Sequence, residues 1–95
     1  MTTVALKKPI TAHGEDVTVL TFKEPTGQEI IECGYPMRIA DGGVIPETGS
    51  IAKYISKLAS VPPSSVRQLG PDDFNACMSA VLGFFGEGEE AEKTS

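Results

Sequence analysis

The sequence predicts an α+β fold, in which a small N-terminal β-hairpin is followed by three to four helices and an acidic disordered C-terminal tail. Three observations support this fold class. β-Branched residues gather on the far side of Gly14, as in a strand that follows a turn. Apolar residues then recur at helical spacing in residues 51–58 and 74–85. Residues 87–95 hold four Glu, one Lys and no large apolar side chain. We therefore expect one domain over residues 1–86, followed by the tail.

The first expected element is the β-hairpin. Residues 3–7 alternate in polarity, and Pro9 ends free ladder pairing because proline has no backbone N–H to donate. A turn that contains glycine follows, and residues 17–23 are rich in the side chains that strands favour. Within this second strand Leu20 and Phe22 share one face, because side chains alternate along a strand. We expect that face to pack into the core.

A short helix is expected over residues 27–33. Thr26 and Glu29 have the spacing of a capping box, in which the threonine hydroxyl accepts a helix N–H and the glutamate accepts the N–H of the cap residue. Gly34 follows the last helical residue and supplies a natural stop.

Residues 35–49 have an irregular composition. They contain three Gly and two Pro, which predicts a loop or an extended crossing. Their apolar content leads us to expect that the segment lies partly on the core. The side chains in question are Met37, Ile39, Val44 and Ile45.

Two helical segments are expected next. A helix over residues 50–60 has a single apolar stripe at i, i+3, i+4 and i+7, formed by Ile51, Tyr54, Ile55 and Leu58. Lys53 and Lys57 fall on the opposite, solvated side. Two prolines then open a short helical turn over residues 64–69, because proline suits the first turn of a helix, and Gly70 closes it.

The last helix is expected to begin at Pro71. Asp72 and Asp73 stand in its first turn, where carboxylates meet the positive end of the helix dipole. Its apolar stripe consists of Phe74, Cys77, Met78, Val81, Leu82 and Phe85. The thirteen residues from Phe74 to Gly86 carry no charge.

The opposite side of this helix carries small residues in place of charges, with Phe84 at its edge. A helix without charges around its circumference is usually buried, yet so small a domain can hardly enclose one on every side. Two interpretations stay open. Either the hairpin and the helix over residues 50–60 cover it, or this side meets a second copy of the chain or a partner helix. The candidate partner-binding residues are Ala76, Ala80, Gly83 and Phe84.

Composition argues against several functions. The net charge is −5, of which −3 falls in residues 87–95, and the basic residues are dispersed, so nucleic-acid binding is disfavoured. No stretch approaches the roughly 20 apolar residues that span a bilayer, and residues 1–8 lack the order of a secretory signal. We expect a protein that stays in the cytoplasm and does not bind membranes.

Catalysis is not expected either. The two cysteines and His13 share no nucleophile motif or metal-ligand spacing, and we expect both thiols to be reduced and partly buried. Gly42-Gly43 lacks the ending of a phosphate-binding loop. We therefore predict no catalytic residues, no cofactor and no metal.

Two stretches resemble the Mu-like family of phage tail assembly chaperones: VALKKPITAHGEDVTVLTFKEPTGQEI near the N-terminus and SIAKYISKLASVPPSSVRQLGPDDFNACMSAVLGFF later. In that family an apolar-basic-Pro segment leads to a Gly turn, a strand, a Glu-Pro-Thr step and a helix. The later part has a Pro-marked turn, a short Leu-ending segment, an Asp-Phe start and an apolar final helix. The resemblance covers residues 4–26 and about 50–85, and is weaker over residues 35–49.

The resemblance implies a role without a catalytic site. Such proteins are expected to coat the tape measure protein in the host cytoplasm before the tail tube polymerises, and to help recruit tail tube subunits. The partners implied are thus the tape measure protein and the tail tube protein, with a second copy of the chain as a further candidate. The alternative is a phage accessory protein on the same scaffold that binds and inhibits a host protein.

Overall fold

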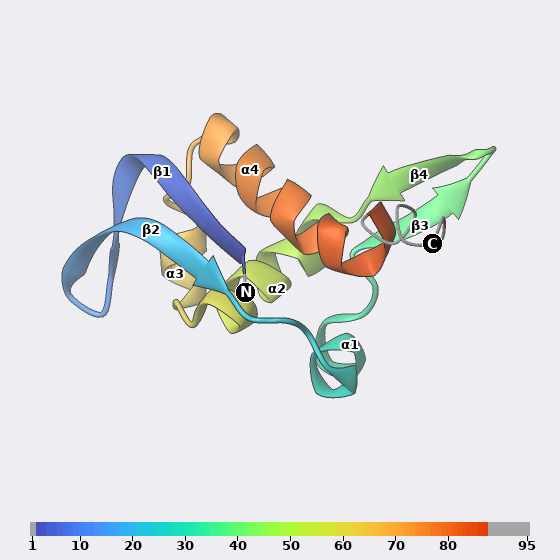
Figure 1. The fold of residues 1–95 in the computed structure, drawn as a ribbon, viewed down its shortest axis with the longest axis horizontal. Coiled ribbons are helices and arrows are strands. Elements are labelled where there is room, and N and C mark those ends of the chain that lie inside the picture. Colours follow the sequence, from blue (N-terminus) through green and yellow to red (C-terminus); the bar gives the residue numbers. More distant parts are fainter. Residues whose placement is uncertain (1, 88–95) are drawn as a thin grey trace.

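The computed structural model describes residues 2–87 and has the predicted α+β class (Figure 1). A hairpin comes first and helices follow, as expected, but a second hairpin interrupts the helices. The tail expected over residues 87–95 lies outside the described residues, apart from Glu87. The elements are β1 (Thr2–Ala12), β2 (Glu15–Phe22), α1 (Gly27–Cys33), β3 (Met37–Ala40), β4 (Gly43–Pro46), α2 (Thr48–Ala59), α3 (Pro63–Val66), α4 (Pro71–Leu82) and the π-helical turn η1 (Gly83–Glu87).

β1 and β2 form an antiparallel hairpin with a bulge. His13 and Gly14 make the two-residue turn, both with positive φ (53° and 77°), as the twist of a tight hairpin requires. Pairing is regular from Thr2 to Ala5, is interrupted, and resumes at Ile10. The expectation that Pro9 ends the pairing is therefore wrong. Pro9 lies inside the bulge, where its missing N–H removes no ladder bond.

The core lies between the β1–β2 hairpin, α2 and α4, with α2 packed against β2, α3, α1 and α4 (Figure 1). Leu20 and Phe22 are buried, which confirms the predicted core face of β2. The predicted stripe of α2 is buried along its whole length. The fully assembled core comprises Ile10, Ala12, Leu20, Phe22, Cys33, Ile51, Tyr54, Ile55, Leu58, Val61, Val66, Cys77 and Val81.

The capping box of α1 is confirmed. The Thr26 hydroxyl accepts from the backbone N–H of Gln28 (3.2 Å), and the Glu29 carboxylate accepts from the backbone N–H of Thr26 (2.8 Å). The Thr26 hydroxyl also donates to the Glu29 carboxylate (2.7 Å), and this bond, together with the one from the Thr26 N–H, holds the pKa of Glu29 below its usual value. Gly34 ends the helix with φ of 78°, a conformation that favours glycine.

The middle segment is not a loop. β3 and β4 pair in register from Met37 to Pro46, and Asp41 and Gly42 form the turn with φ of 42° and 77°. This hairpin lies at the opposite end of the molecule from β1–β2 (Figure 1). Its apolar side chains do not lie on the core as expected, since Ile39 is 80% exposed and Val44 61%. A two-stranded sheet that no other layer covers leaves both of its faces open to solvent.

The last helix ends earlier than its apolar pattern predicts. α4 stops at Leu82, and within η1 the backbone leaves helical geometry at Phe85 and Gly86, whose φ values are −110° and 151°. Of the six residues in the expected stripe, only Cys77 and Val81 are fully buried, and the other four are half-buried.

Candidate protein-binding surface

A buried carboxylate fixes α4 against the first hairpin. Asp73 lies in the first turn of α4 and is only 4% exposed. Its carboxylate accepts from the backbone N–H of Lys7 (2.8 and 3.1 Å) and from that of Lys8 (3.1 Å), both inside the β1 bulge. The bulge leaves these two N–H groups without strand partners, and Asp73 satisfies them. The plain interpretation of Asp73 as a helix-start residue therefore missed its main contact.

The four candidate residues on α4 and η1 do not share one environment. Ala76 and Gly83 are exposed, whereas Ala80 and Phe84 are half-buried and pack against the core. The fold thus covers one side of α4 and leaves the side of Ala76 and Gly83 open. The uncharged helix is therefore neither covered by its own chain on every side nor open on every side.

Apart from Val19 on β2, the large apolar side chains that are exposed within the described residues all come from α1, the β3–β4 hairpin and the link between them. We call them the distal apolar surface, because β3–β4 lies at the opposite end of the molecule from β1–β2 (Figure 1). Its members are Ile31, Tyr35, Ile39, Val44 and Ile45. Tyr35 joins it to η1, because its ring meets that of Phe85 edge to face with the centroids 6.0 Å apart. Phe85 in turn contacts the buried Tyr54 (5.3 Å), whose hydroxyl donates to the Gly34 carbonyl (2.5 Å).

Sequence reasoning missed this surface. The signal for it was Asp41-Gly42, a dipeptide typical of tight hairpin turns, between two short runs that contain β-branched residues. The glycines and prolines of the segment obscured that signal.

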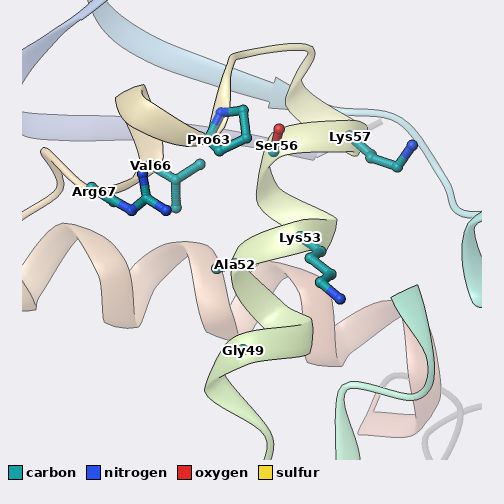
Figure 2. A pocket seen from close by; sticks show the side chains of 8 residues that line it. All are labelled: Gly49, Ala52, Lys53, Ser56, Lys57, Pro63, Val66 and Arg67. Atoms are coloured by element: carbon teal, nitrogen blue, oxygen red, sulfur yellow. The ribbon is translucent and has the colours of Figure 1, made fainter. Parts of the chain in front are cut away.

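A groove of about 380 Å³ runs along α2 beside α3, and we call it the α2–α3 groove. Figure 2 shows Arg67 on the α3 side, with Lys53 and Lys57 extending from the far side of α2. Its lining residues are Gly49, Ala52, Lys53, Ser56, Lys57, Pro63, Val66 and Arg67. The wall is mostly apolar, since Gly49, Ala52, Pro63 and Val66 make up half of its residues and the three basic side chains have long aliphatic stems.

Lys57 also connects the groove to α1. Its ammonium lies 2.7 Å from the Glu32 carboxylate. That hydrogen bond holds the pKa of Glu32 below its usual value and raises the pKa of Lys57. Both groups are therefore charged near neutral pH.

The nucleophilic side chains are poorly placed for chemistry. Cys33 and Cys77 are both free and buried. Burial raises the pKa of Cys33, and raises that of Cys77 to about 11, which disfavours the reactive thiolate. Within residues 2–87 no group of three or more His, Cys, Asp or Glu could hold a metal ion. None of the helices in that range is long and apolar enough to cross a membrane.

Comparison with known proteins gives one match. A family model described as "Phage tail assembly chaperone proteins, E, or 41 or 14" matches residues 3–86, including the middle segment where the resemblance was weaker. No curated protein and no solved structure matches. The narrower resemblance to Mu-like members remains a prediction, because the match is to the family as a whole. Since the match covers most of the 95 residues, the chain belongs to the phage tail assembly chaperone family.

Proposed function

We propose that this chaperone binds the tape measure protein in the host cytoplasm, keeps its apolar helices soluble and helps to recruit tail tube subunits. It acts by binding alone, without a catalytic step. Residues 1–86 form the binding domain, and the acidic residues 87–95 add negative charge that favours solubility. Family membership supports the general role, and the exposed surfaces of the domain support a partner protein.

The observation that carries this proposal is the distal apolar surface. Contiguous exposed apolar surface on a soluble protein marks a site of interaction with other proteins. Here Ile39 and Val44 form a directly opposed cross-strand pair, and both are mostly exposed. Tyr35, four residues before Ile39 in the chain, is also exposed and contacts Phe85 of η1.

The open side of α4 is proposed as a second contact. Ala76 and Gly83 have no large side chain, so a partner backbone can approach closely there. Ala80 and Phe84 border this strip from its half-buried edge. An Ala76→Glu variant tests this contact cleanly, because the exposed position tolerates a charge without loss of folding.

Co-expression with the tape measure protein of the same phage tests the function. The wild-type chain should raise the soluble fraction of the tape measure protein and copurify with it. An Ile39→Lys/Val44→Glu variant should copurify less, because it replaces the apolar pair by an ion pair. This variant keeps the net charge, and opposite charges across a hairpin maintain the strand pairing.

The matched control is Thr3→Lys/Thr21→Glu. Thr3 and Thr21 are also a cross-strand pair and are both exposed, but they lie on the β1–β2 hairpin. The control should behave as wild type. If the wild-type chain leaves the tape measure protein insoluble and captures a host protein instead, the assembly function is refuted in favour of host inhibition.

A further inference from the structure

We infer that the α2–α3 groove is a docking site for an acidic amphipathic helix of a partner protein. This inference rests on the proposed function, because it takes that helix to be a segment of the tape measure protein. It adds the chemical character of the segment and the place where it binds.

The charge of the groove supports this choice of partner. The protein as a whole carries −5, yet three of the seven basic side chains within residues 2–87 line this one groove, and no acidic side chain lines it. Lys53 and Arg67 make no salt bridge within the described residues, and Lys57 is still 46% exposed beside Glu32. Two cations on one side and one on the other match carboxylates on both flanks of a ligand.

The shape of the groove supports a helix. Gly49, Ala52 and Ser56 follow one another along α2 at helical spacing, so a second helix can lie close to its axis. A cavity of about 150 Å³ holds a benzene-sized group. The groove of about 380 Å³ therefore takes roughly two apolar side chains from one face of the incoming helix.

The chain's own C-terminal residues match the groove less well. Residues 88–95 contain three Glu, but Ala91 is their only apolar side chain, so they would satisfy the charges and leave the apolar wall uncovered. Only a segment that is both acidic and apolar matches the two features together.

The probes are two peptides of about 18 residues, long enough for a helix to form. One has Leu and Ala along one face and Glu on both flanks, and the other has Lys in place of every Glu. Titration by fluorescence anisotropy should show that the full-length protein binds the Glu peptide more tightly than the Lys peptide. Added salt should weaken the binding of the Glu peptide, because exposed charges are screened.

A matched pair of variants places the binding in the groove. Lys53→Gln/Arg67→Gln should weaken binding of the Glu peptide by about 2- to 30-fold, the effect of losing two exposed ion pairs. Lys7→Gln/Lys8→Gln makes the same change in net charge in the β1 bulge and should leave binding unchanged. All four side chains belong to exposed residues, so both variants should melt near the wild-type temperature.

Four results would overturn the inference. The first is equal affinity for the two peptides, and the second is unchanged affinity in Lys53→Gln/Arg67→Gln. The third is binding of the Glu peptide that appears only after Glu89, Glu90 and Glu92 are all changed to Gln. That result would mean that the chain's own C-terminal residues occupy the groove. The fourth is a wild-type dimer that dissociates in the Lys53→Gln/Arg67→Gln variant. That result would mean that a second copy of the chain occupies the groove.

Copurification with the tape measure protein tests the docking site separately from the proposed function. One outcome is that the wild-type chain and the Lys53→Gln/Arg67→Gln variant capture the tape measure protein equally well. That result would refute the α2–α3 groove as the docking site and leave the proposed function intact. Failure of wild type to capture the tape measure protein, with selective binding of the Glu peptide, would refute the proposed function instead.

Discussion

Replacing Asp73 by alanine should destabilise the domain far more than replacing its neighbour Asp72. The Asp73 carboxylate accepts from two backbone N–H groups in the β1 bulge and is almost fully buried. Hydrogen bonds to charged groups contribute about 1.5–3 kcal/mol each. Because water can reach the freed N–H groups of a partly buried bulge, we expect a total loss of about 2–3 kcal/mol. For a domain of this size that lowers the melting temperature by about 8–24 °C.

Asp72→Ala is the matched control. Both aspartates lie in the first turn of α4, so their interaction with the helix dipole is similar. Among the described residues, however, Asp72 makes only an exposed ion pair with Lys7 (3.3 Å), which contributes at most about 1 kcal/mol. Urea unfolding followed by circular dichroism gives both free energies. Equal losses for the two variants would refute the role assigned to the Asp73 carboxylate.

Three further predictions concern stability and reactivity. Phe22→Ala should cost about 3–5 kcal/mol, since the ring is fully buried, and a melting temperature within a few degrees of wild type would contradict this. Burial raises the pKa of Tyr54 to about 12, so the unfolded chain loses this proton near pH 10 while the folded chain keeps it. The free energy of unfolding should therefore fall by up to roughly 2–3 kcal/mol between about pH 10 and 12, and by less in Tyr54→Phe, as measured by urea unfolding at each pH. Cys33 and Cys77 should react with a thiol reagent only after denaturant is added, and fast labelling of the native protein would show that they are not buried.

The spacing of residues in the sequence correctly predicted those features of the fold that depend only on residues close together in the chain. The alternation that places Leu20 and Phe22 on one face, the stripe of α2 and the capping box at Thr26 each depend on residues a few positions apart. Such spacings can be recognised in a single sequence because each of them arises within one helix or one strand.

Other features depend on contacts that no local pattern contains. Asp73 and its partner Lys7 are 66 residues apart, so the sequence shows only an acid at a helix start. The β3–β4 hairpin is exposed on both faces, and burial therefore leaves no clear alternation in its strands. The backbone leaves helical geometry at Phe85 and Gly86, and the apolar spacing that continues to Phe85 does not show this change.

The sequence pattern and the structure direct attention to different parts of the surface. The uncharged helix predicts apolar surface on α4, and that site stays a prediction, whereas the most exposed large apolar side chains of the described residues lie on α1 and the β3–β4 hairpin. The α2–α3 groove was hidden for another reason. The spacing of Lys53 and Lys57 on α2 is typical of a solvated face, and only the packing of α3 beside α2 brings Arg67 to the same groove.

The most direct test of the central claim is a light-scattering assay of purified tape measure protein diluted from denaturant. We predict that the chaperone suppresses the aggregation in proportion to its concentration and that the two proteins then migrate together in size-exclusion chromatography. Aggregation at the same rate and extent with the chaperone in molar excess would contradict the account.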